Sequence, residues 1–135
     1  MTNYKTKDSG KRQEYNSGMR RDLQDGKPNL YLWIPKDWPY EEQLLTRIGA
    51  LATRGAEKYG ARNSELANSK EELERFKASA MRHFMQWIMG ETDEDHAAAI
   101  YFNIYMVEYL TWKLKQKNEK ERSSRNKKRI STTKK

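Results

Sequence analysis

The sequence predicts an all-α fold, namely a compact helical bundle of three main helices. Apolar residues recur at steps of three and four in three separate stretches, which is the period of an α-helix. Glycines and capping-box spacings stand at the ends of these stretches, where helices begin and stop. The chain has 135 residues and no internal repeat, so it has room for one domain with one modest core. A loop-rich arm is expected before this domain and a disordered basic tail after it.

The N-terminal part of the chain shows no helical period. Residues 1–19 are polar and contain no apolar run, which predicts a flexible arm. The stretch that follows contains one glycine and three prolines, which exclude a long helix and predict a loop. We therefore place the main all-α domain at residues 20–117.

Two helices are expected in the first half of this domain. One covers residues 41–58, and a glycine-containing stretch ends it. The other covers residues 69–89. Ser69 and Glu72 have capping-box spacing at its start, and Gly90 offers a stop at its end.

The third predicted helix covers residues 93–117. Thr92 and Asp95 repeat the capping-box spacing, and acidic residues occupy the first turn, where the helix dipole favours them. Because the connection at Gly90 is short, the second and third helices must form an antiparallel hairpin.

The positive charge of the chain lies in its tail. The whole sequence carries a formal net charge of +8. Residues 113–135 contain eleven lysines and arginines and two glutamates, a net charge of +9, which leaves −1 for residues 1–112. Since the tail has almost no apolar residues, residues 118–135 are expected to be disordered. They either keep the chain soluble or make non-specific contacts with nucleic acid.

The composition of the chain also bears on the cellular compartment in which the protein acts. The chain contains no cysteine, which excludes a disulfide framework and a thiolate metal site and is compatible with a reducing cytoplasm. No segment approaches the roughly 18 apolar residues that a membrane helix requires, and the N-terminal stretch does not have the pattern of a signal peptide. A soluble cytoplasmic protein without a membrane partner is expected.

Two polar stripes are expected to face each other inside the hairpin. Ser79, His83 and Gln86 share one face of the second helix, and His96 and Asn103 share one face of the third. A turn at the glycine between the helices places Ser79 level with Asn103, and His83 about one turn beyond His96. These groups either satisfy one another as core polar residues or line a ligand pocket.

Acidic residues follow at the open end of these stripes. Glu91, Asp93, Glu94 and Asp95 could supply oxygen ligands of the kind that Mg²⁺ or Mn²⁺ prefers. Glu94 and Asp95 also fit an ordinary role at a helix start. We interpret the combination with two histidines as a metal or polar-ligand pocket.

Phosphate binding has weaker support. Arg75 and Arg82 lie seven apart on the second helix and could offer guanidinium groups to a phosphate, with Lys58 and Tyr59 in the loop before them. Each could equally be a solvated surface residue. The sequence contains no glycine-rich phosphate loop.

Four motifs resemble a known family, the phage-encoded dATP/dGTP diphosphohydrolases, which are usually likened to the MazG-type all-α nucleoside triphosphate pyrophosphohydrolases. The motifs are RDLQDGKP, GAEKYGARN, ERFKASAMRHFMQW and GETDEDHAAAIYFN. The resemblance covers residues 20–110 and implies an all-α nucleotide-binding domain, a purine deoxynucleotide substrate and a divalent cation. The chain departs from the family pattern at Ser64, where a tryptophan is expected, and it does not clearly reproduce the MazG-type acidic pair of motifs.

The motif positions that match the family are Lys27, Lys58, Tyr59, Asn63, Arg82, His83, Glu91, Asp93, His96 and Asn103. Among these, the resemblance implies catalytic roles for His83, His96 and Glu91, and a cation held by Glu91 and Asp93 with Asp95 beside them. The residues expected to contact the nucleotide are Lys27, Lys58, Tyr59, Asn63, Arg75, Arg82 and Asn103.

The expected function is therefore metal-dependent hydrolysis of dATP and dGTP with Mg²⁺ or Mn²⁺, in the host-cell cytoplasm if the chain is phage-encoded. Two alternatives stay open: a protein that sequesters a nucleotide without cleaving it, and a small DNA-binding accessory protein that uses the basic tail. The leaving group stays open as well. A homo-oligomer is expected, because the third helix carries spare aromatic surface at Tyr101, Tyr105, Tyr109 and Trp112.

Overall fold

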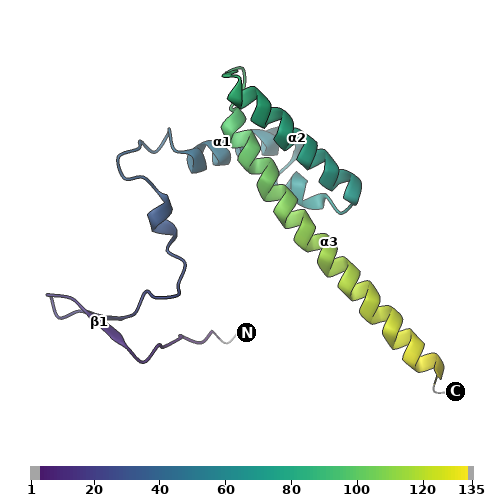
Figure 1. The fold of residues 1–135 in the computed structure, drawn as a ribbon, viewed down its shortest axis with the longest axis horizontal. Coiled ribbons are helices and arrows are strands. Elements are labelled where there is room, and N and C mark those ends of the chain that lie inside the picture. Colours follow the sequence, from purple (N-terminus) through teal and green to yellow (C-terminus); the bar gives the residue numbers. More distant parts are fainter. Residues whose placement is uncertain (1–3, 134–135) are drawn as a thin grey trace. The chain divides into compact units, whose positions relative to one another are not determined.

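Three helices make up most of the chain in the computed structural model, which describes residues 4–133 (Figure 1). They are α1, Leu44–Tyr59; α2, Lys70–Ile88; and α3, His96–Thr133. The predicted all-α class is confirmed. Two compact units divide the chain, Met1–Asp37 and Trp38–Lys135, and the three helices all belong to the second.

The first unit contains a small β-hairpin, where the sequence predicts a flexible arm at residues 1–19. Strand β1, Arg12–Glu14, pairs antiparallel with β2, Arg20–Asp22. Arg12 lies opposite Asp22 and Glu14 opposite Arg20, so opposite charges face each other across the strands. Gly18 adopts a φ of 86° in the turn, a conformation that glycine accepts readily. This pairing was missed because the strands are short and lack an apolar alternation. Residues 1–3 of the arm lie outside the described residues.

A short 3-10 helix, η1, Leu30–Trp33, follows the hairpin in the stretch for which the sequence predicts a loop. The side chain of Asn29 accepts a hydrogen bond from the Tyr31 backbone and caps it. All of its residues are exposed within the described chain.

Helices α2 and α3 pack side by side as the predicted antiparallel hairpin (Figure 1). Gly90 ends α2 with a φ of 78°. Its N–H donates to the Trp87 carbonyl at 3.1 Å, and the Glu91 N–H donates to the Gln86 carbonyl at 3.0 Å. These two bonds form a Schellman motif, which requires a left-handed residue at the position that Gly90 occupies.

At the other end of α2, the predicted capping box is confirmed. The Ser69 hydroxyl accepts from the Glu72 N–H at 3.2 Å, and the Glu72 carboxylate accepts from the Asn68 N–H at 3.1 Å.

Helix α3 begins at His96, three residues later than predicted, because Asp95 itself is the capping residue. Its Oδ1 atom accepts from the Ala98 N–H at 3.1 Å.

The core of the second unit is small and lies mainly along α3. Among the described residues, the buried apolar side chains are Ala67, Ala98, Ala99, Met106 and Leu110. Three polar residues share this core, namely His83, His96 and Asn103. Helix α1 packs on α3 with no fully buried residue of its own, so its packing is loose compared with that of the α2–α3 hairpin.

The C-terminal segment differs from its prediction. Residues 118–135 were expected to be disordered, but α3 continues to Thr133 as one helix, and residues 134–135 lie outside the described chain. Residues 117–133 are all exposed, so packing does not hold this segment. It extends a helix that is already nucleated, and its lysines, arginines and glutamates are good helix formers. Among residues 4–133, no helix contains a stretch both long and apolar enough to cross a bilayer.

Candidate active site in a cleft beside the hairpin

An open cleft of about 1010 Å³ lies among α1, the turn that follows it, α2 and α3. This volume is at the upper end of the range of about 300–1,000 Å³ typical of small-molecule sites. Four side chains of α3 line it: Ala99, Phe102, Asn103 and Met106. Opposite them lie residues of α1 and of the 3-10 helix η2, Asn63–Leu66.

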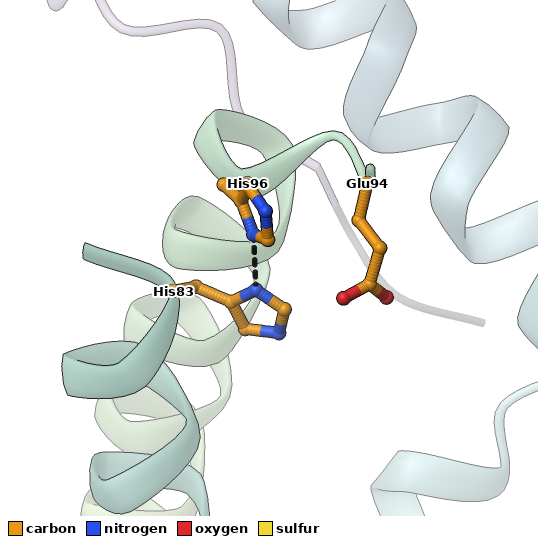
Figure 2. Close-up of side chains that lie close together, drawn as sticks. All are labelled: His83, Glu94 and His96. Atoms are coloured by element: carbon orange, nitrogen blue, oxygen red, sulfur yellow. Dashed lines mark hydrogen bonds between the residues drawn. The ribbon is translucent and has the colours of Figure 1, made fainter. Parts of the chain in front are cut away.

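Two buried histidines meet between α2 and α3 (Figure 2), and one of them, His83, lines the cleft. His83 of α2 is 7% exposed and His96 of α3 is 2% exposed. Their Nδ1 atoms lie 2.9 Å apart. Nε2 of His96 lies 2.7 Å from Oδ1 of Asp93, and Nε2 of His83 lies 3.3 Å from a guanidinium nitrogen of Arg82. The sequence places His83 about one turn beyond His96, whereas the structure brings the two rings into direct contact.

The hydrogen-bond partners show which ring nitrogens of His83 and His96 carry protons. A carboxylate only accepts, so His96 carries a proton on Nε2 and donates it to Asp93. If His96 is neutral, its Nδ1 accepts from the Nδ1–H of His83, whose Nε2 in turn accepts from Arg82. Burial lowers the pKa of His83, and the charge of Arg82 lowers it further, which favours this neutral form. The His96 hydrogen bond lowers the pKa of Asp93.

Carboxylates surround the pair of imidazoles. His83, Glu94 and His96 offer one ligand atom each within 4.8 Å of one another, and so do Glu91, Asp93 and His96. Figure 2 shows Glu94 reaching down beside the two rings from the turn before α3. Asp93 and Glu94 line the cleft. The arrangement could hold a cation, since imidazole and carboxylate are both common metal ligands.

Asp95, which the sequence predicts as a metal ligand, belongs to neither of these clusters. Both of its oxygens accept hydrogen bonds of 2.8 Å from Arg47 of α1, and one also caps α3. The hydrogen bond from Arg47 lowers the pKa of Asp95. The Asp95 carboxylate therefore already accepts hydrogen bonds from Arg47 and from the first turn of α3.

Glu91 is held by a different partner. Its carboxylate accepts a hydrogen bond of 2.7 Å from the Gln86 side chain, and it is exposed outside the residues that line the cleft.

Three of the predicted nucleotide contacts line the cleft, namely Tyr59, Asn63 and Asn103. Asn103 is buried, and its side-chain N–H donates to the Ala99 carbonyl of its own helix at 2.7 Å. Its remaining amide oxygen is a candidate for recognition of a ligand.

The other predicted contacts are not among the lining residues. Lys58 lies at the end of α1 with its ammonium 5.0 Å from the centre of the Tyr59 ring. Arg75 donates to Ser79, and Arg82 donates to Gln86 in addition to its contact with His83. Lys27 belongs to the first unit, where its ammonium donates to Asp22 at 2.9 Å.

The structure adds two cationic residues that sequence reasoning missed, Arg54 of α1 and Arg62 of the turn after it. Arg54 follows Leu51 by one helical turn, a spacing that could have placed it on the inner face. No sequence signal identifies Arg62, because its place depends on a left-handed backbone with a φ of 61°. Glu94 was counted among the acidic residues at the open end of the stripes but was not chosen as a metal ligand, since its position suits an ordinary helix start.

Residues 15–122 match the model of a protein family described as dATP/dGTP diphosphohydrolase, N-terminal. The chain belongs to this family. The match confirms the resemblance carried by the four motifs, and it spans every residue that lines the cleft. The description of the family supports hydrolase activity in general. No curated protein and no solved structure matches the chain.

Proposed function

We propose that the chain hydrolyses the deoxypurine nucleoside triphosphates dATP and dGTP in this cleft, with a divalent cation. The observation that carries the proposal is the combination, in one open cavity, of an imidazole–carboxylate cluster with two guanidinium groups. The family description names the same substrates.

The charges of the cleft support a cation-dependent reaction. Four carboxylates line it, those of Glu65, Asp93, Glu94 and Asp95. Glu65 pairs with Arg62 and Asp95 with Arg47, so Asp93 and Glu94 form the acidic end of the cleft. A triphosphate is strongly negative, so the acidic end repels it unless a cation offsets the charge. We therefore keep Mg²⁺ or Mn²⁺ as the proposed cofactor, held at the turn that carries Asp93 and Glu94. When bound there, the cation polarises a phosphoryl oxygen and lowers the pKa of a water molecule.

Residues of the chain then have distinct proposed roles. Arg54 and Arg62 offer hydrogen-bond donors to the phosphates. Tyr59 presents an aromatic face for a base, and the amide of Asn103 can recognise the sugar or the base. His83 faces the cleft, and burial lowers its pKa, which favours the neutral imidazole. That form is needed either to accept a proton from the attacking water or to bind a cation.

Three further proposals accompany this function. The absence of cysteine is compatible with action in the cytoplasm, where we place it. The exposed apolar side chains of α2 and α3 are compatible with a homo-oligomer. The exposed basic part of α3 could contact nucleic acid without sequence preference.

Product analysis tests the proposal against its two rivals. The cation-free full chain is incubated with a large excess of each of the four deoxynucleoside triphosphates, with Mg²⁺, Mn²⁺ or neither, and the nucleotides are separated by anion exchange. We expect turnover of dATP and dGTP that requires the cation and exceeds that of dCTP and dTTP. Retention of one intact nucleotide per chain supports a sequestering protein instead. Absence of both, with binding of DNA, supports the accessory protein.

A further inference from the structure

We propose that His83, His96 and Glu94 form a binding site for one first-row transition cation, such as Mn²⁺ or Zn²⁺. The ligands are Nδ1 of both imidazoles and one carboxylate oxygen of Glu94, with Asp93 as a positioning residue. This inference refines the cation site and rests on the proposed function for its role in hydrolysis. The binding itself can be measured without nucleotide.

The separation of the two Nδ1 atoms suits a shared cation. Two nitrogens bound to one cation at about 2.1 Å each would lie about 3.0 Å apart at the right angle of an octahedral site and about 3.4 Å apart at the tetrahedral angle that Zn²⁺ prefers. The Nδ1 atoms of His83 and His96 lie 2.9 Å apart. Because the two rings come from different helices of the hairpin, their approach is fixed by tertiary packing and does not depend on a flexible loop.

The contact between His96 and Asp93 matches the environment of a metal-bound imidazole. A histidine ligand commonly donates its other ring N–H to a carboxylate, which fixes the tautomer and the ring orientation. His96 meets this condition, since its Nε2 atom lies 2.7 Å from the Asp93 carboxylate. Its Nδ1 lone pair is then directed away from Asp93 and toward His83.

One proton must move for the cation to bind. When both imidazoles are neutral and hydrogen-bonded to each other, His83 carries its proton on Nδ1. Binding of a cation to Nδ1 requires that this proton move to Nε2. That nitrogen lies 3.3 Å from a guanidinium nitrogen of Arg82, so two donors would face each other. Arg82 is exposed and also donates to Gln86, which leaves it free to turn away from His83.

The second cluster, Glu91 with Asp93 and His96, competes for the same imidazole and is the weaker candidate. Asp93 lies 2.7 Å from Nε2 of His96, so a cation bound to both residues through that nitrogen would replace the hydrogen bond between them and require the His96 proton on Nδ1. Glu91 is in addition held by Gln86 and does not line the cleft.

The ligand set determines the kind of cation. Two imidazoles and one carboxylate suit Zn²⁺, Co²⁺ or Mn²⁺, whereas Mg²⁺ prefers oxygen ligands and retains its water. Three protein ligands leave at least one position open, as in catalytic sites. His83 and Glu94 line the cleft, so the open position would face a phosphate of the substrate.

Nitrogen NMR tests this assignment directly, because the chain contains only two histidines. The full chain is labelled with ¹⁵N-histidine, stripped of metal and titrated with Zn²⁺. We expect the Nδ1 signals of both imidazoles to shift on binding of one equivalent, while both Nε2 atoms carry protons. Shift of the His96 Nε2 signal instead, or no shift in either ring, would overturn the proposal.

A second test compares the affinity of four variants for Co²⁺, which is measured from the visible absorption of the bound cation. We expect His83→Gln and Glu94→Gln to weaken binding more than any other change, and Asp93→Asn to weaken it about 10- to 100-fold, as loss of an orienting carboxylate does. Glu91→Gln is the matched control and should bind as the parent does. Equal loss in Glu91→Gln and none in Glu94→Gln would assign the cation to the other cluster and overturn the proposal.

Each variant is checked by circular dichroism. If His83→Gln does not fold, Glu94→Gln decides the test, because Glu94 is exposed and its loss leaves the core intact. Cation binding without nucleotide hydrolysis would contradict the proposed function alone. Hydrolysis without any shift of the imidazole signals would contradict this inference alone.

Discussion

Arg47 and Asp95 join α1 to the beginning of α3 through two hydrogen bonds, each 2.8 Å long, between a guanidinium and a carboxylate. The two side chains are 33% and 23% exposed, so water screens the pair only in part. The same carboxylate caps α3. Since the packing of α1 contains no buried residue, this pair helps to set the distance between α1 and the hairpin, and with it the width of the cleft.

Loss of this pair should destabilise the protein. We expect Asp95→Asn to lower the free energy of unfolding by about 1–3 kcal/mol, because a partly buried bidentate pair and a cap lose a charge. Glu74→Gln is the control: Glu74 pairs with Lys77 on the surface of α2, and its loss should cost no more than about 0.5 kcal/mol. Urea unfolding measures both. Equal small losses would show that the Arg47 pair does not hold α1.

The pair of Arg47 and Asp95 should also make the free energy of unfolding depend on pH. The Arg47 hydrogen bond lowers the pKa of Asp95 in the folded chain, so the stabilisation is present above the unfolded-state pKa of about 3.9 and is lost as the pH falls through the lower folded value. The difference in stability between the parent and Asp95→Asn should therefore be constant from about pH 7 to pH 5 and shrink below about pH 4. A difference that stays constant down to pH 3 would contradict this account.

The two arginines that line the cleft should matter more than the arginine predicted on α2. We expect Arg54→Gln to raise the KM for dATP about tenfold, the effect of roughly 1.4 kcal/mol lost from one charged contact. Arg75→Gln should leave KM unchanged, because Arg75 bonds to Ser79 outside the lining residues. Steady-state kinetics of both variants make the comparison. A higher KM in Arg75→Gln than in Arg54→Gln would instead favour the phosphate contacts predicted from the sequence.

The basic end of α3 should be dispensable for hydrolysis. Residues 117–133 are exposed and contribute nothing to the buried core. A chain that ends at Lys117 should therefore keep the turnover and the Tm of the full chain. A fall in either quantity would show that this part of the helix packs against something, such as a second copy of the chain.

We expect the chain to form a homo-oligomer through α2 and α3. Met81, Phe84 and Ile104 are 61%, 42% and 51% exposed and line a shallow groove of about 300 Å³ between the two helices. Light scattering should give a mass above that of the monomer, and Phe84→Glu should lower it. A monomeric parent at micromolar concentration would contradict the prediction.

Local signals predicted the helices well. The periodicity of α1 and α2, the capping box at Ser69 and the glycine stop at Gly90 are all properties of neighbouring residues, and each is present in the structure. The start of α3 was misplaced by three residues because Asp95, and not Thr92, caps the helix. The contact of Asp95 with Arg47, 48 positions away in the sequence, could not be predicted from a local pattern. The hairpin of the first unit was missed for another reason, because its three-residue strands carry no apolar alternation.

The candidate site was predicted in part. The pairing of His83 with His96 follows from helical period and a short turn, and so does their neighbourhood to acidic residues. Which acidic residues reach the imidazoles does not follow, because the turn before α3 brings Asp93 and Glu94 close to them, whereas Glu91 bonds to Gln86. The place of Arg62 depends on a left-handed backbone that its residue type does not indicate.

Nucleotide-dependent melting tests the central claim most directly, namely that a purine deoxynucleotide and a cation bind together in the cleft. Melting curves are recorded for the parent and for Asn103→Leu, with and without dATP or dGTP, in the presence of Mn²⁺. We expect the parent to gain stability with ligand, by about 2.7 kcal/mol when the nucleotide concentration is 100 times Kd, and the variant to gain much less. A parent whose Tm responds to no nucleotide would contradict the cleft as the binding site, and with it the proposed function.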